Sequence, residues 1–382
     1  MSNRILPVSA PVIYLLLLFL IGPAALMQGN NPLLWMLCVL IVIGVLAWYL
    51  TRQMLNDLQV RRILPDHGQV GEPVPVEYRL SRTSRFLPAF DITVTERLSS
   101  MMKDASSAWI LHVGPGETVH GEGLFVPTRR GRLQFNEVEV RTAFPMGIMP
   151  RRKRLHVPQD LRVHPEMYPL RPALIRSLLG TGGQGRRSID RNGSGLDYFG
   201  TRSIRPGDGI RDIAWKISAR RDEWIAIERS LPASPRIRVV LDLTIPTDAL
   251  QVASDDRWTA SQLEENAISL AASILQDAST RGYDIGLSVQ GLDCPMHGLR
   301  GGLRHLGRIL GSLADLDLTH ERRPWSAIPE RERAGLVVIH PDRVRKTLNR
   351  SDAWHLTARQ LDDLVSTNVA DPDGNDLSGS VA

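Results

Sequence analysis

Two long stretches without charge near the N-terminus constrain the fold of this chain more than any other feature. Residues 5–27 carry no charged side chain, and neither do residues 32–50. A helix needs about 20 apolar residues to cross the hydrocarbon core of a bilayer. The connection between the stretches is short, neutral and turn-forming, so the two helices must be antiparallel neighbours. We therefore predict a transmembrane two-helix hairpin in residues 1–52, with spans at about 5–27 and 32–50.

Arginine residues on either side of this hairpin predict its orientation. Arg4 precedes the first span, Arg52, Arg61 and Arg62 follow the second, and the connection has no basic residue. By the positive-inside rule, both ends of the hairpin then face the cytoplasm. This predicts a multi-pass protein of the inner (plasma) membrane whose later domains are cytoplasmic. If residues 1–27 were a cleaved signal peptide instead, the second span would still leave those domains in the cytoplasm.

Residues 58–165 show the alternating pattern of β-strands. Val74, Val76 and Tyr78 alternate with proline or charged residues, which places the three larger side chains on one face of a strand. Pro75 has no backbone donor, so we expect this strand at the edge of its sheet. Turn-forming residues separate the strands at intervals typical of sandwiches. We predict a β-sandwich of immunoglobulin-like build.

A run of four basic residues, Arg151-Arg152-Lys153-Arg154, lies near the end of this region. It is interpreted either as a contact with anionic lipid or as a solvated strand end. The whole chain has a net charge of +5, from 46 basic and 41 acidic residues. Because this excess is mild, it does not favour nucleic acid as a partner, and the membrane ranks before it.

Residues 166–234 form an Arg- and Gly-rich linker that ends in a charged motif. Pro206-Gly207-Asp208 has the composition of a turn, and Asp208 can accept local backbone donors. Arg211, Trp215 and Ser218 recur at helical spacing, which predicts one face of a short helix. Basic and acidic side chains nearly cancel here, which favours an ion-pair network or a partner interface over a nucleic-acid surface. The alternative is that the segment only braces the next domain.

The motif G-x-R-x-x-x-P-G-D-x-x-R-x-I-x-W-x-x-S-A-R, which starts at Gly200, resembles the signature of the bacterial "domain of unknown function 58" family. Ser203, Ile204 and Ala214 depart from the residues common in that family. The resemblance implies a membrane anchor, a β-rich region and a von Willebrand factor A-like domain, with a MoxR-type AAA+ ATPase as partner. The interaction residues that it implies are Arg202, Gly207, Asp208, Arg211, Trp215, Ser218 and Arg220.

Residues 235–366 alternate between strand and helix patterns. An apolar run at 236–244 reads as a buried strand, residues 263–280 as an amphipathic helix, and further strands and a helix follow. Such alternation predicts a doubly wound, mostly parallel sheet. The tail at 367–382 has the composition of a disordered segment.

A metal-ligating role is implied for the end of the first strand of this domain. The von Willebrand factor A-like resemblance implies Asp-x-Ser-x-Ser oxygens that hold Mg²⁺, an ion that prefers oxygen ligands. This chain has Asp242 and Thr244, but Pro246 takes the third position. We therefore expect at most a degenerate Mg²⁺ site and no other cofactor. The alternative is an aspartate satisfied by backbone groups.

The residues and the resemblance together predict a membrane-tethered interaction or scaffold protein. Its expected role is that of an adaptor for a MoxR-type ATPase acting on envelope or metal-containing complexes. The chain contains no G-x-S-x-G, H-E-x-x-H or G-x-x-x-x-G-K-[ST] motif, so no catalytic residue is nominated and an enzyme is not expected. A hydrolase-like enzyme and a basic lipid- or nucleic-acid-binding protein remain the alternatives.

Overall fold

The computed structural model describes most of the chain and divides it into two compact units, residues 1–164 and 165–382. The described residues are 10–28, 31–83, 87–97, 99–145, 147–171, 188–205, 208–232, 235–250, 252, 256–326, 334–344 and 353–365. For residues 188–199 and 228–232 the description covers the backbone. The predicted disordered tail at 367–382 lies outside this part of the chain.

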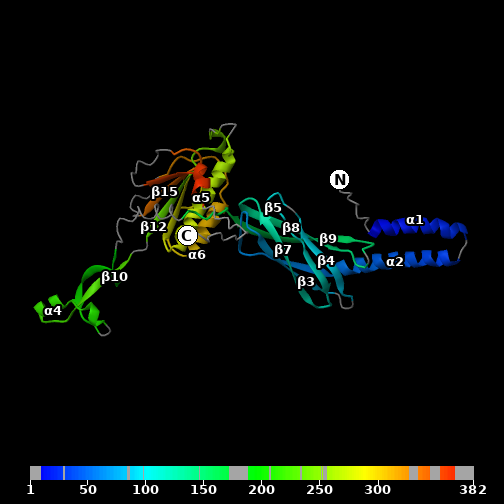
Figure 1. Ribbon diagram of the computed structural model, residues 1–382, viewed down its shortest axis with the longest axis horizontal. Helices are drawn as coiled ribbons and strands as arrows, with labels where there is room; N and C mark the ends of the chain where they lie inside the picture. Colours follow the sequence, from blue (N-terminus) through cyan, green and yellow to red (C-terminus); the bar gives the residue numbers. More distant parts are fainter. Residues whose placement is uncertain are drawn as a thin grey trace, which may run out of the picture. The chain divides into compact units, whose positions relative to one another are not determined.

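The first unit begins with two apolar helices, α1 (Ala10–Gln28) and α2 (Asn31–Asn56), which lie side by side (Figure 1). Both are long and apolar enough to cross a membrane, in agreement with the sequence analysis. The second helix does not end with the apolar stretch at Leu50 but continues to Asn56. Its 26 residues give a length of about 39 Å, which exceeds the ~30 Å of a hydrocarbon core.

A small residue allows the two helices to approach each other closely. Tyr14 of α1 donates its hydroxyl hydrogen to the carbonyl oxygen of Leu40, at 2.9 Å. A Cβ atom at Gly44 would overlap with the hydroxyl group of Tyr14, so a larger residue at that position would displace this side chain. Small residues that permit close backbone contact are typical of helix pairs in membranes.

The rest of the first unit consists of two sheets. Their strand orders are β1-β3-β7-β5 and β2-β9-β8-β4-β6. The bounds are β1 Leu58–Ile63, β2 His67–Gln69, β3 Val74–Arg82, β4 Ala89–Glu96, β5 Met102–Lys103, β6 Ala108–Val113, β7 Thr118–Pro127, β8 Gly131–Thr142 and β9 Arg151–His164. One hydrophobic core takes residues from both sheets and also Met54 and Leu55 from α2. The end of the apolar helix is therefore part of the β-rich body.

The predicted inward face of β3 is confirmed, but its predicted position at a sheet edge is wrong. Val74, Val76 and Tyr78 are all buried, as the alternation indicates. However, β3 lies between β1 and β7. Pro75 is tolerated there because β1 pairs with β3 only from Glu77 onward, so that side of the strand has no partner at the proline.

A buried ion pair joins the two sheets across this core. Arg62 of β1 donates to both carboxylate oxygens of Glu96 on β4, at 2.6 and 2.9 Å, and Tyr78 of β3 donates to the same group at 3.0 Å. Burial and the adjacent Glu96 carboxylate raise the pKa of Tyr78 far above its ordinary value. Arg62, counted with the arginines that orient the hairpin, is therefore engaged inside the sandwich.

The second unit contains a β-hairpin where the sequence indicates a linker. Strand β10 (Ser188–Ser203) pairs antiparallel with β11 (Ile225–Pro232). Between them lie the 3₁₀ turn η1 (Ile210–Asp212) and the helix α4 (Trp215–Arg221). The prediction that Arg211, Trp215 and Ser218 share one helix face is wrong. Arg211 belongs to η1, and the extended backbone between the two elements breaks the helical repeat.

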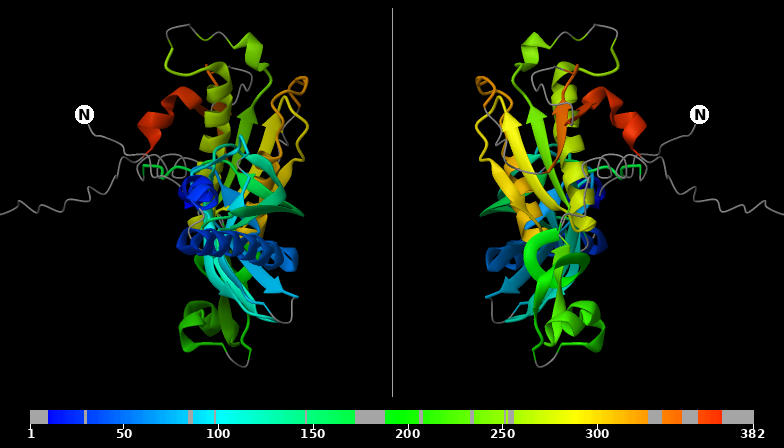
Figure 2. Two further views of the ribbon diagram at one scale, coloured as in Figure 1. Left: turned by 90° about the vertical axis from the view of Figure 1, so that its right-hand side faces the viewer. Right: turned by 90° about the vertical axis from the view of Figure 1, so that its left-hand side faces the viewer.

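The second unit also contains a five-stranded sheet of order β14-β13-β12-β15-β16 (Figure 2). Strands β12, β13, β15 and β16 are parallel, and β14 runs antiparallel to β13. The bounds are β12 Arg236–Asp242, β13 Asp284–Gln290, β14 His297–Arg300, β15 Gly335–His340 and β16 Ala353–Thr357, with α5 Ala260–Thr280, α6 Leu303–Ala314, α7 Leu361–Leu364, η2 Thr247–Ala249 and η3 Ala358–Gln360. The predicted alternation of strands and helices is present.

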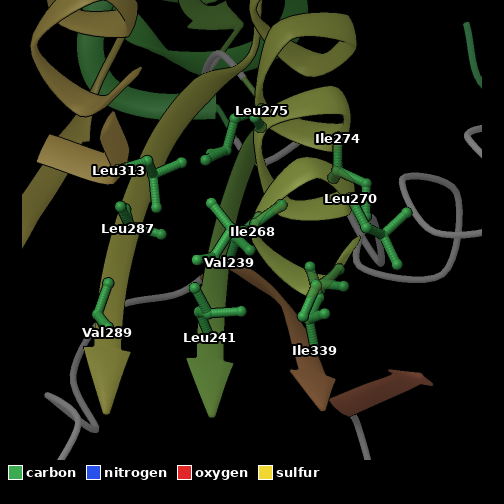
Figure 3. Packing of buried hydrophobic residues seen from close by; sticks show 14 of the residues in the cluster. Val239, Leu241, Ile268, Leu270, Ile274, Leu275, Leu287, Val289, Leu313 and Ile339 are labelled. Carbon is green, nitrogen blue, oxygen red and sulfur yellow. The ribbon is translucent and has the colours of Figure 1, made fainter. Parts of the chain in front are cut away.

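Packing on this sheet explains why its strands are so apolar. Val239 of β12 lies beside Ile268 of α5, and Leu241 of β12 and Leu313 of α6 belong to the same core (Figure 3). Val240, on the opposite face of β12, packs against β15 residues and Trp325 instead. Strands that are buried on both faces carry apolar residues in succession, as Val239, Val240 and Leu241 do.

We predict that Gly44→Leu separates the two apolar helices, because the added side chain would overlap with Tyr14. The protein in detergent should then unfold at a lower temperature. Gly22→Leu is the matched control, since a Cβ at that helical position meets no atom within 4 Å. Equal midpoints for both variants in thermal denaturation would contradict this packing.

Candidate functional site

The carboxyl ends of β12 and β15 form the first candidate site. These strands are neighbours, and the chain leaves β12 toward β13 on one side while β15 lies on the other. In open α/β sheets, ligands bind at such a switch point, beyond the carboxyl ends of the strands. Asp242 ends β12 and His340 ends β15, so the fold brings these two side chains together here.

Both oxygens of the Asp242 carboxylate are engaged by the protein itself. Oδ1 accepts hydrogen bonds from the Thr244 backbone nitrogen at 3.2 Å and from its hydroxyl at 2.7 Å. Oδ2 lies 3.0 Å from Nδ1 of His340. Burial raises the pKa of Asp242, but the hydrogen bonds from His340 and Thr244 outweigh it and hold that pKa below its ordinary value. The aspartate is therefore a stable, charged acceptor.

A second histidine extends this contact toward the surface. His340 is only 1% exposed, and its Nε2 lies 3.1 Å from Nδ1 of His355 on β16. The two rings are stacked with centroids 5.4 Å apart. Because Asp242 accepts, His340 carries its proton on Nδ1, and its Nε2 accepts from His355. Burial, and then the neighbouring His340 ring, lower the pKa of His355.

The residues at this position do not fit a magnesium ion. Mg²⁺ requires several oxygen ligands in near-octahedral arrangement. The oxygens of Asp242 already accept three hydrogen bonds, the Thr244 hydroxyl donates to one of them, and Pro246 has no side-chain oxygen. In the part of the chain that the structure describes, no group of three or more His, Cys, Asp or Glu side chains could hold a metal. The metal role of Asp242 and Thr244 stays a prediction from sequence.

The second candidate site is the connection between β10 and β11, residues 204–224, which we call the hairpin tip. Both carboxylate oxygens of Asp208 accept from the Arg202 guanidinium at 2.7 Å. The Arg205 backbone nitrogen donates to the same carboxylate at 2.7 Å, so the predicted local capping by Asp208 is present. The Arg202 side chain, followed by the Arg205 N–H, lowers the pKa of Asp208 to about 2. This contact closes the turn of the motif.

Ser218 has a structural role in the hairpin tip. It is buried, and its hydroxyl accepts from the backbone nitrogen of Ile225 at 3.0 Å. The Ala214 nitrogen donates to the Ile225 carbonyl at 2.8 Å, so α4 is held against the start of β11 from both ends of its first turn. The exposed motif residues are Arg211, Trp215 and Arg220, whereas Gly207 lies outside the described residues.

Large apolar side chains are exposed on this tip. Ile210 is 75% exposed, Trp215 56% and Trp224 57%, and Ile204 is also exposed. The two indole rings meet edge to face with centroids 5.6 Å apart. The motif reading in the sequence analysis includes Trp215 but misses Trp224 and Ile210. A signal for Trp224 exists in the sequence, because this large aromatic residue directly follows four charged residues, Arg220-Arg221-Asp222-Glu223.

Comparison with known proteins adds little about activity. No family model matches the chain. It is similar to an uncharacterized protein, YeaD, of Bacillus subtilis (strain 168), with 24% identity over 276 residues. The aligned part covers 71% of this chain and 64% of the relative, so the chain spans less than two thirds of that protein's length. The resemblance to the domain of unknown function 58 family therefore remains an expectation.

We predict that replacing Asp242 by Asn lowers the free energy of unfolding by about 2 kcal/mol, because a buried acceptor for His340 and Thr244 is lost. Asp248→Asn, at an exposed position in η2, should leave it unchanged. Thermal denaturation with and without Mg²⁺ tests the metal as well. Stabilisation of the wild type by Mg²⁺ that disappears in Asp242→Asn would show that a site exists after all.

The Asp208 contact predicts a defined pH dependence of the hairpin tip. The folded pKa of about 2 lies below the ordinary value of 3.8, so the contribution of this group to stability is present above pH 4 and is lost as the pH falls through 2. The protection of the Arg205 amide from exchange, relative to an unstructured peptide at the same pH, should therefore fall only in that acidic range. Asp208→Asn should lower this protection already at neutral pH, whereas Asp222→Asn, at an exposed position in the tip, should not.

Proposed function

We propose that this chain is a membrane-tethered interaction protein that binds a protein partner through its hairpin tip. The observation that carries the proposal is the exposed apolar surface of Ile204, Ile210, Trp215 and Trp224. Helices α1 and α2 anchor the chain in the inner (plasma) membrane, and the arginines that flank them support a cytoplasmic location for the later domains.

The chemistry of the tip is that of a binding hot spot. Tryptophan and arginine dominate the residues that contribute most to protein–protein affinity, and contiguous apolar patches on a soluble surface mark interaction sites. The edge-to-face contact of Trp215 and Trp224 and the Arg202–Asp208 pair hold the tip in one conformation. A preorganised surface loses less conformational entropy on binding, so more of the contact energy appears as affinity.

Charge on the rim of the tip favours an acidic partner surface. Exposed basic residues outnumber exposed acidic ones here, since Asp208 is neutralised by Arg202. The exposed basic residues are Arg205, Arg211, Lys216, Arg220 and Arg221, against Asp222 and Glu223. Complementary charge increases association rates and disfavours wrong partners.

The partner that we propose is a MoxR-type AAA+ ATPase, with envelope or metal-containing complexes as clients. This part of the proposal rests on the signature motif between Gly200 and Arg220. In the same proposal, the two sheets of the first unit form an immunoglobulin-like sandwich and the parallel sheet belongs to a von Willebrand factor A-like domain. The shared core of the sheets and the strand order support these assignments.

A hydrolase-like enzyme is the second candidate, because Asp242, His340 and His355 form a hydrogen-bonded chain. An aspartate that orients a histidine is typical of general-base catalysis. In the described part of the chain, however, His355 has no hydrogen bond to a serine, threonine or cysteine that could act as nucleophile. The hairpin tip therefore carries the main proposal.

Crosslinked affinity purification of the full-length protein from native membranes, followed by mass spectrometry, tests the proposal. We expect enrichment of an AAA+ ATPase, and at least a tenfold loss of that enrichment in the double variant Trp215→Ala/Trp224→Ala at unchanged protein level. Leu303→Ala removes an apolar side chain elsewhere that is even more exposed, at 77%, and should have no effect. His355→Gln should also retain the partner. Equal enrichment with the tryptophan variant, or no ATPase with the wild type, would contradict the proposed role.

A further inference from the structure

The end of α2 indicates which part of the first unit lies at the membrane surface. This step rests on the membrane anchoring proposed above. The helix is about 9 Å longer than a hydrocarbon core, so its last turns extend beyond the apolar layer. Trp48 and Tyr49 lie just before this point, where aromatic rings favour the interface. Arg52 follows one turn later, with its guanidinium 5.5 Å from the centre of the Trp48 ring. Residues from Thr51 onward are therefore at the level of the lipid headgroups.

Three contacts fix the β8–β9 connection at this same level. The Thr51 hydroxyl donates to the carbonyl oxygen of Phe144, at 2.9 Å. Lys153, near the start of β9, donates to the last carbonyl groups of α2, those of Leu55 and Asn56, both at 2.9 Å. At the other helix, Gly147 lies against Ala10, the first described residue of α1. The end of β8 and the start of β9 thus lie beside the membrane surface.

On the outer face of this sheet end, one row of side chains crosses four strands. Register pairing places Trp109 of β6 opposite Thr93 of β4, Thr93 opposite Arg141 of β8, and Arg141 opposite Arg152 of β9. Trp109 is 60% exposed, and both arginines are exposed as well. The row has the composition of a membrane interface, with an indole at one end and two guanidinium groups at the other.

The two arginines lie in an unfavourable arrangement unless an anion binds between them. Like charges directly opposite each other on antiparallel strands are destabilising. The carboxylate nearest to Arg152 is that of Glu139, at 3.5 Å, and Glu139 is shared with Arg154 at 3.8 Å. Within the described residues, Arg141 forms no ion pair. The three arginines Arg141, Arg152 and Arg154 stand against two carboxylates, Asp91 and Glu139, so one positive charge is in excess here.

A shallow depression of about 390 Å³ lies beside these arginines. Hydroxyl groups of Thr93, Thr95 and Ser107 line it together with Arg141 and Arg152. The carboxylates of Asp91 and Glu139 also line it, and Asp91 accepts from the Trp109 indole at 2.9 Å. Guanidinium groups bind phosphate through two parallel hydrogen bonds, and hydroxyl groups can donate to the remaining oxygens. The depression thus combines the groups that recognise a phosphate with a position at headgroup level.

We propose that Arg141 and Arg152 bind the phosphate of an anionic phospholipid headgroup in the leaflet where α2 ends. This assigns the basic run at 151–154 two distinct roles. Lys153 points to the carbonyl groups of α2, whereas Arg152 faces the lipid from the outer side of the sheet. The bound headgroup relieves the repulsion between the paired arginines and ties the β-rich body to the membrane surface. Each basic residue near the membrane surface contributes about 1 kcal/mol, so the two arginines together give roughly a thirtyfold preference for anionic lipid.

Hydrogen–deuterium exchange of the full-length protein in nanodiscs tests this site. We expect phosphatidylglycerol, compared with phosphatidylcholine alone, to slow exchange in peptides covering residues 91–95, 107–111 and 139–154 severalfold. The double variant Arg141→Gln/Arg152→Gln should lose this difference. Arg132→Gln/Arg162→Gln is the matched control, because these arginines are also directly paired on β8 and β9, at the opposite end of the strands. It should retain the difference.

Further outcomes separate this site from the membrane anchoring on which it rests. Inorganic phosphate added to phosphatidylcholine discs should not reproduce the protection, because the site recognises a headgroup held at this depth. A wild-type protein that enters nanodiscs but shows the same exchange in both lipids would overturn the headgroup site and leave the anchoring intact. A protein that stays soluble without detergent and does not enter nanodiscs would overturn the anchoring itself.

Discussion

The burial of the end of α2 in the β-rich body is the interaction on which the first unit depends. Met54 and Leu55 belong to the core between the two sheets, so the helix cannot move independently of the strands. Lys153 satisfies two of the carbonyl groups that every helix leaves unpaired at its C-terminus, and its charge is favourable there. A flexible tether would let the domain move freely above a membrane. This junction instead fixes which strands lie next to the end of the apolar helix, and the proposed lipid site follows from that placement.

The carboxyl edge of the parallel sheet shows how a ligand position can be occupied by the protein itself. The fold places Asp242 where open α/β sheets bind ligands, and His340 from the neighbouring strand fills that position. Both oxygens of this carboxylate accept hydrogen bonds from protein groups, and His355 stacks on the His340 ring. A buried charge with such partners is costly to alter, because any substitution leaves a donor unsatisfied. We therefore assign this network mainly to stability, and binding to the hairpin tip.

Sequence reasoning found part of the tip and missed the rest for a physical reason. The turn residues and Asp208 were predictable, because a carboxylate beside a turn accepts local backbone donors. Its bidentate contact with Arg202 was not, since the irregular pairing of β10 with β11 decides which side chains meet. Helical spacing suggested that Arg211, Trp215 and Ser218 share one face, yet Arg211 lies outside the helix that contains the other two. Periodicity holds only within one continuous helix, and here a 3₁₀ turn precedes a helix of seven residues.

The sequence by itself determined the elements whose signal is local. The uncharged stretches specify two long apolar helices, and the alternation of Val74, Val76 and Tyr78 specifies a half-buried strand, because chain geometry alone sets these periods. Tertiary structure decided everything that depends on register between distant segments. It placed Arg141 opposite Arg152 on neighbouring strands and joined Arg62 to Glu96. It also brought His340 to Asp242, which is 98 residues away in the sequence. Such contacts follow from strand order and pairing, and no local pattern in the chain encodes them.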